Sequence, residues 1–124
     1  MNYNEDTIKS YLKNILSISS PSGYTQKIMD YINDELNILN VPHFITNKGA
    51  IIITLKGKNN DYQRTLSAHV DTLGAMVKTI NSSGSLGLDP IGGYMMNSIE
   101  GENCTIETID GKTFTGTIHC KIGR

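Results

Sequence analysis

One stretch decides how the rest of the sequence is interpreted, namely Ser67-Ala68-His69-Val70-Asp71-Thr72-Leu73-Gly74. It has the composition of an apolar strand that runs into a turn, and it carries a histidine and an aspartate two positions apart. Side chains at positions i and i+2 of a strand point to the same face. His69 and Asp71 can therefore share one side of a strand end, where the carboxylate would hold one nitrogen of a metal-binding imidazole. Ligands of open α/β sheets gather at such strand ends.

The same pair is also compatible with a structural role, in which a core histidine meets an aspartate that caps a turn. A catalytic zinc site needs about three protein ligands and an open water position, and His69 supplies only one of them. The sequence has no second His-x-Asp, no Glu-Glu pair and no His-Glu-x-x-His, so no general base can be assigned. The later carboxylates are expected at solvated turns and strand edges: Asp89, Glu100, Glu102, Glu107 and Asp110.

The remaining candidates for chemistry are weaker. Cys104 and the His119-Cys120 pair lack a Cys-x-x-Cys spacing, so a metal site there is not favoured. His43 follows a proline and is expected to be a surface strand residue. Ser20-Pro21-Ser22-Gly23 lacks the Gly-x-Ser-x-Gly pattern of a nucleophile elbow and is interpreted as a turn.

The bulk composition excludes several classes of protein. The 124 residues suit one domain, and the net charge of -1 comes without a basic run that would favour nucleic acid or an anionic membrane. The start of the chain has neither the basic residues nor the apolar run of a secretory signal, and no apolar run could cross a bilayer. Two cysteines do not make a disulfide framework, so we expect a reduced, cytoplasmic protein.

The periodicity of the apolar residues changes along the chain. Residues 4–18 and 24–39 have the spacing of amphipathic helices, and Asn4 is a plausible N-cap for the first. Residues 43–46, 50–56 and 65–70 are expected as strands, and Ile51–Ile53 is apolar on both faces, as in a central strand. From Gly74 onward there is no helix pattern. Strands are expected at 75–80, 86–91, 103–109 and 113–118, the last two joined by Asp110-Gly111.

These patterns predict an α/β fold class. Residues 1–72 would begin an α/β sheet domain, and residues 73–118 would form part of a small all-β domain. The change of pattern at residues 72–74 is the expected domain boundary.

Several segments together match one known family. The strongest is Leu66–Val77, which contains a specific His-x-Asp-x-x-Gly segment, and the shorter ones are Ser20–Tyr24, Asn47–Ala50, Ile91–Gly93 and Glu100–Cys104. Over residues 6–118 the chain resembles the N-terminal third of the dinuclear metallo-aminopeptidases called glutamyl or deblocking aminopeptidases, which form tetrahedral assemblies. The all-β part then corresponds to an inserted domain that mediates subunit contacts in that family.

The resemblance implies a function and a set of site residues. His69 would bind one of two divalent metal ions, zinc or cobalt, and Asp71 would be the catalytic-site carboxylate that steadies it. The intact enzyme would hydrolyse the N-terminal residues of peptides and form a homo-oligomer through the β domain. The other ligands and the glutamate base belong to later segments of the family. This chain would hold at most a partial metal site and be inactive by itself.

The end of the chain departs from the family pattern. After Gly116-Thr117-Ile118 the family continues toward a proline-containing segment, whereas this sequence ends with residues 119–124. Lys-Ile-Gly-Arg is also what a common sequencing adapter encodes in one frame. We therefore expect these residues to be non-native and the reading frame to be truncated.

Two other functions compete with this interpretation. A stand-alone β-rich interaction module could pair its exposed strand edges with another chain. Related sequences are also labelled endoglucanases, but glycoside hydrolysis needs two carboxylates about 5 to 9.5 Å apart across a sugar. The histidine motif argues against that label.

Overall fold

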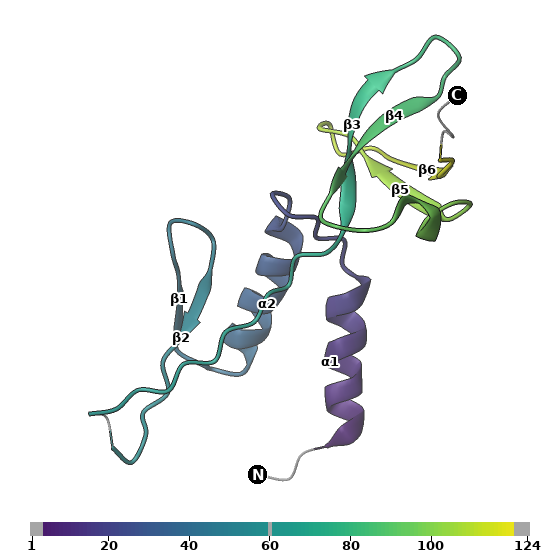
Figure 1. The fold of residues 1–124 in the computed structure, drawn as a ribbon. Coiled ribbons are helices and arrows are strands. Elements are labelled where there is room, and N and C mark those ends of the chain that lie inside the picture. The colour runs from purple at the N-terminus through teal and green to yellow at the C-terminus, as the bar shows by residue number, and fades with distance from the viewer. Residues whose placement is uncertain (1–3, 60, 121–124) are drawn as a thin grey trace. The chain divides into compact units, whose positions relative to one another are not determined.

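The computed structural model describes residues 4–59 and 61–120. The chain divides into two compact units, one up to Gly92 and one from Gly93 (Figure 1). The domain boundary expected at residues 72–74 stays a prediction. Of the expected non-native tail, residues 121–124 lie outside the described part.

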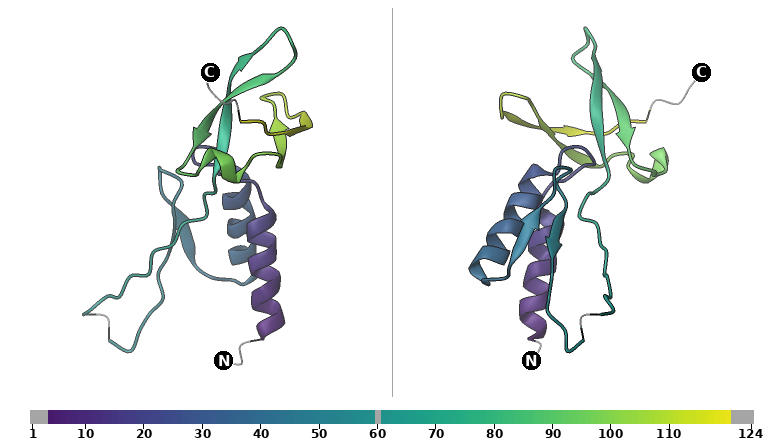
Figure 2. Two further views of the ribbon diagram at one scale, coloured as in Figure 1. Left: turned by 45° about the vertical axis from the view of Figure 1, so that its right-hand side comes forward. Right: turned by 90° about the vertical axis from the view of Figure 1, so that its left-hand side faces the viewer.

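The first unit begins with two helices, α1 (Glu5–Ser17) and α2 (Gln26–Ile38), close to the expected ranges. They lie side by side and run in opposite directions (Figures 1 and 2). The predicted N-cap is confirmed, because the Asn4 side chain accepts a hydrogen bond from the Asp6 N–H at 3.0 Å. Between the helices, the Asn14 amide donates to the Tyr31 hydroxyl at 3.2 Å.

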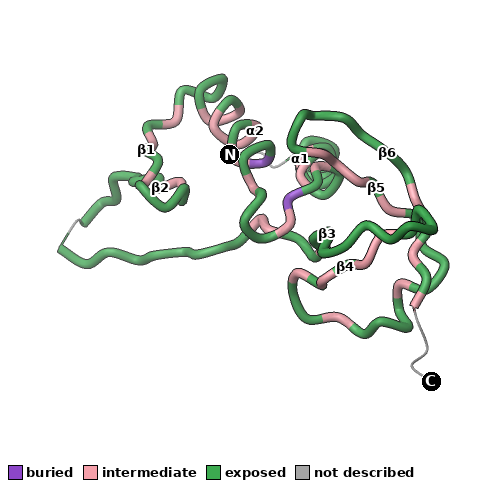
Figure 3. The backbone as a smooth tube through the Cα atoms, turned by 90° about the horizontal axis from the view of Figure 1, so that it is seen from above, coloured by how far each residue is buried: buried purple, intermediate pink, exposed green. Residues whose placement is uncertain are grey.

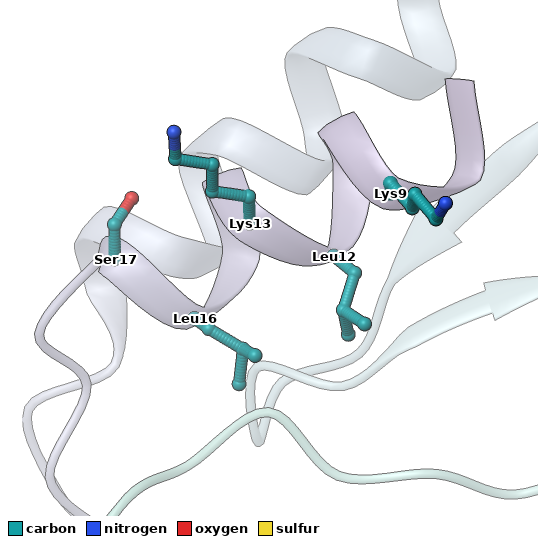
Figure 4. Close-up of a pocket in the computed structure, with 5 residues that line it drawn as sticks. All are labelled: Lys9, Leu12, Lys13, Leu16 and Ser17. Carbon is teal, nitrogen blue, oxygen red and sulfur yellow. The ribbon is translucent and has the colours of Figure 1, made fainter. Parts of the chain in front are cut away.

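Only part of the apolar stripe of α1 is covered. Tyr11 and Ile15 are half-buried, whereas Ile8, Leu12 and Leu16 are 53%, 55% and 68% exposed. Leu12 and Leu16 project from the same side of the helix (Figure 4). They line a shallow depression of about 440 Å³ together with Lys9, Lys13 and Ser17. Among residues 4–59 and 61–120, this face of α1 lacks the apolar cover that its periodicity predicts.

Strands β1 (His43–Ile45) and β2 (Ile51–Ile53) form an antiparallel hairpin. The prediction of a central strand at Ile51–Ile53 is wrong for this structure, because β2 pairs only with β1 among the described residues. Ile52 and Ile53 are 40% and 44% exposed. The strand expected at 65–70 is also wrong, since in the described chain these residues have no ladder partner.

The first unit ends in a second hairpin, β3 (Gly74–Ile80) and β4 (Leu86–Ile91). In the turn between them the Gly84 N–H donates to the Asn81 carbonyl at 2.9 Å, and Gly84 has φ +85°. Glycine adopts such a positive φ at little cost, which explains why the last residue of the turn is a glycine.

Very little of the described chain is buried. Ile28 and Ser20 are the two fully buried residues among those described (Figure 3). Large apolar side chains therefore remain in water. None of the helices within the described ranges has both the length and the apolar character needed to cross a lipid bilayer.

The second unit consists of a short 3-10 helix and a hairpin. The helix η1 (Met96–Ser98) has no counterpart in the sequence-based expectation. Strands β5 (Asn103–Glu107) and β6 (Thr113–Thr117) pair antiparallel, which confirms the expected hairpin around Asp110-Gly111. Mixed helices and antiparallel strands across both units agree with the α/β class.

The turn of this hairpin is expected to weaken in acid. The Asp110 carboxylate lies 2.7 Å from the Lys112 ammonium and accepts the Thr108 hydroxyl at 2.5 Å. The bond from Lys112, and then that from Thr108, lowers the pKa of Asp110. Because the pKa of Asp110 is lower in the folded than in the unfolded chain, the ionised carboxylate stabilises the turn at pH values above the unfolded pKa, about 3.9. That contribution disappears as the pH falls through the folded pKa. The amide shift of Gly111 should report this loss in a pH titration by NMR.

Asp110→Asn provides the control for that titration. Asparagine keeps the size of the side chain but does not ionise in this range, so the acid-dependent shift of the Gly111 amide should disappear. An unchanged titration curve in Asp110→Asn would show that another group causes it.

Candidate functional site

The pair singled out in the sequence comes together as expected. The His69 Nδ1 lies 2.9 Å from the Asp71 Oδ1. Since an ionised carboxylate only accepts hydrogen bonds, Nδ1 carries the proton and donates. The His69 side chain is 85% exposed, so Nε2 is the ring nitrogen that solvent or a metal ion can reach. This is the tautomer that suits an Nε2 metal ligand.

A third residue completes the arrangement. The Ser22 hydroxyl donates to the other carboxylate oxygen of Asp71, Oδ2, at 2.5 Å. Each oxygen of Asp71 thus has its own donor. The bond from Ser22, and then that from His69, lowers the pKa of Asp71, so the carboxylate is ionised at neutral pH.

The loop that carries Ser22 is fastened to the His69–Asp71 segment by its neighbours. The buried Ser20 hydroxyl donates to the Val70 carbonyl at 2.7 Å, and the Thr72 N–H donates to the Ser20 carbonyl at 2.8 Å. Pro21 and Thr72 form an isolated parallel bridge. These contacts hold the loop against residues 70 and 72, on either side of Asp71. They fix the register between the loop and the His69–Asp71 segment without any ligand.

Two glycines permit this close approach. Gly23 has φ +87° and lets the chain turn back, with the Tyr24 N–H donating to the Pro21 carbonyl at 2.8 Å. At Gly74 an added Cβ would come within 2.7 Å of the Pro21 Cβ. A side chain at position 74 would therefore push the loop away from the segment that carries Asp71.

The three side chains open onto a cleft of about 540 Å³ within the first unit. Besides Ser22, His69 and Asp71, it is lined by Thr72, Leu73 and Gly92. Gly92 has φ +92°, and an added Cβ there would lie 2.6 Å from the Leu73 Cδ2. The cleft thus places an apolar wall beside an exposed imidazole, which suits a ligand with both polar and apolar parts.

The residues present fit one position of a metal centre. Imidazole nitrogen is a good ligand for zinc and similar ions, and a carboxylate behind the ring is the usual outer partner. No group of three or more His, Cys, Asp or Glu side chains that could hold an ion occurs in the part of the chain that the structure describes. Among the described residues, His69 with Asp71 therefore offers at most one ligand position.

The other candidate ligands are engaged elsewhere. The half-buried His43 lies 2.8 Å from the Val41 carbonyl and 3.0 Å from the Asn33 Oδ1, so its ring has a structural role. In the second unit, Glu100 accepts the Cys120 N–H and lies 3.3 Å from the His119 Nδ1. The Glu100 carboxylate raises the pKa of the Cys120 thiol, which disfavours the thiolate that a metal needs.

Ser22 belongs to the site, although the sequence did not single it out. The Ser-Pro-Ser-Gly stretch is correctly expected as a turn, but its contact with Asp71 spans 49 positions of sequence. The signal available was indirect, because the stretch also belongs to the segments that carry the family resemblance.

Comparison with known proteins shows which proteins the chain resembles. The sequence model of a family described as M42 glutamyl aminopeptidase matches residues 49–122. The chain is 50% identical over 107 residues to a Bacillus subtilis (strain 168) protein named as the aminopeptidase YhfE, covering 86% of this chain and 31% of that protein. It is 28% identical over 102 residues to the glutamyl aminopeptidase of Lactococcus lactis subsp. cremoris (strain MG1363), covering 82% and 29% respectively.

A solved structure has the same fold. It is the TET aminopeptidase of the marine sediment archaeon Thaumarchaeota archaeon SCGC AB-539-E09, with a TM-score of 0.80 at 23% identity. The match covers 94% of this chain and 32% of that one. The chain thus spans about a third of the length of each of these proteins.

Proposed function

The chain belongs to the M42 glutamyl aminopeptidase family, and we propose that it forms the N-terminal part of a metal-dependent aminopeptidase that releases N-terminal residues from peptides. The observation that carries the proposal is the exposed His69 ring with Nδ1 held by Asp71 and Nε2 facing solvent beside a cleft. A histidine that binds a catalytic metal ion usually donates its other ring N–H to a carboxylate in this way.

Each residue has a defined task in this proposal. His69 binds a divalent ion, zinc or cobalt, through Nε2. Asp71 keeps the proton on Nδ1 and fixes the plane of the ring. When bound, such ions act as Lewis acids and lower the pKa of a bound water to near neutrality. Leu73 and Gly92 line the cleft beside the ring.

The rest of the site would come from later segments of the intact enzyme. We propose that these supply the second metal position and the general base, and that the β segment after Gly74 contributes to contacts between subunits of a homo-oligomer. The cytoplasmic location expected from the sequence remains part of the same proposal.

A chimera tests the proposal. Residues 1–118 would replace the matching third of the Bacillus subtilis relative, which is 50% identical. With Zn²⁺ or Co²⁺ present, the chimera should release N-terminal amino acids from peptides, whereas the 124-residue chain alone should release none, because one imidazole cannot hold the centre. A chimera that folds, as judged by circular dichroism, yet hydrolyses no peptide would refute the proposed function.

A further inference from the structure

The exposed hydroxyl of Ser22 has a task distinct from that of the neighbouring Ser20. Ser20 is 0% exposed, and its hydroxyl satisfies the Val70 carbonyl, so it fastens the loop. Ser22 is exposed, and water could solvate its hydroxyl at little cost. It nevertheless donates to Asp71. The Ser22 bond is therefore not needed to satisfy a buried group.

We propose that Ser22 is a positioning residue, whose hydroxyl fixes the Asp71 carboxylate so that Oδ1 holds the Nδ1 proton of His69 and Nε2 is directed toward a divalent metal ion. The inference rests on the proposed function of His69 as a metal ligand. A carboxylate with one donor can rotate about its Cα–Cβ and Cβ–Cγ bonds, whereas donors on both oxygens hold the side chain in one rotamer and define the plane of the carboxylate. That plane in turn defines the direction of the imidazole.

The surroundings make the hydroxyl of Ser22 the natural donor for Oδ2. Pro21 has no N–H, and its bridge to Thr72 places the next residue beside Asp71. Gly23, with φ +87°, turns the chain away immediately afterwards. The Pro-Ser-Gly sequence thus presents one hydroxyl at one position. The order of these residues therefore positions a donor for the Asp71 carboxylate and also forms the turn.

NMR of the 15N-labelled 124-residue chain tests the proposal through His69 and Asp71 themselves. In the wild type we expect the Nδ1–H tautomer of His69 and a single χ1 rotamer of Asp71. Ser22→Ala should mix both, Ser22→Thr should restore them, and Ser19→Ala, which removes an exposed hydroxyl of the same loop, should change neither. Unchanged tautomer and rotamer in Ser22→Ala would overturn the proposal, as would mixed states already in the wild type.

Titration with Zn²⁺ alone then separates this inference from the proposed function. Loss of a direct partner of a metal-binding histidine weakens binding 10- to 100-fold, so Ser22→Ala, one bond further away, should raise the dissociation constant followed at the His69 ring roughly threefold. Equal constants in wild type and Ser22→Ala would refute the positioning role alone. A His69 ring that Zn²⁺ perturbs in no variant would refute the metal-ligand role on which the proposal depends.

Discussion

Replacing His69 by alanine in the active chimera is expected to lower kcat/KM for peptide hydrolysis on the order of a thousandfold, since a catalytic metal supplies several kcal/mol of transition-state stabilisation. Bound metal per chain, measured by mass spectrometry, should fall in parallel. Asp71→Asn should cost less, about 10- to 100-fold, because the ligand remains and only its outer partner is impaired.

His43→Gln is the matched control for this series. His43 contacts the Val41 carbonyl and Asn33, so the substitution should lower thermal stability slightly while metal content and kcat/KM stay near those of the unmodified chimera. If His69→Ala retained full activity and full metal content, the histidine would not be a ligand, and the assignment of this cleft as the active site would fail.

The second large effect concerns the chain by itself. With so much apolar surface in water, we expect the 124-residue chain to self-associate at micromolar concentration and to bind a hydrophobic dye. Light scattering after size exclusion should give a mass above the 13.6 kDa of one chain. Burying a leucine contributes about 1.5–3 kcal/mol, so Leu12→Lys with Leu16→Lys should weaken association by tenfold or more.

Ser10→Lys adds a lysine to the polar face of α1 instead of the apolar face and should leave the association unchanged. A monodisperse chain of 13.6 kDa that binds neither dye nor metal would contradict the expectation. That result would favour the competing interpretation, in which the chain is a stand-alone interaction module.

The sequence predicted those parts of the fold that short-range chemistry determines. Asn4 caps α1 as expected, and the turns at Gly84 and Gly111 form because glycine tolerates positive φ. The apolar Ile51–Ile53 run was a less reliable guide. Apolar side chains on both faces indicate that a strand is suited to burial on both sides. They do not indicate that the elements which would cover those faces lie in the same chain.

The candidate site shows the same difference between short-range and long-range contacts. The sequence predicted the His69–Asp71 contact from side-chain alternation over two positions of a strand. The contact forms, although residues 65–70 have no ladder partner in the described chain. The Ser22 contact depends on the bridge between Pro21 and Thr72, which no local pattern encodes. A serine in a turn is common, and only the folded chain shows that this hydroxyl reaches the carboxylate.

The bridge between Pro21 and Thr72 also has a consequence for the order of events during synthesis. The bond from Ser20 to Val70 closes a loop of 50 positions, and closing such a loop costs roughly 3.5 kcal/mol of chain entropy beyond a constant. Helix α1 can form while the ribosome is still translating the middle of the chain. The Ser-Pro-Ser-Gly turn can dock only after residue 72 has emerged, so His69 and the residues that support it would reach their arrangement in one late step.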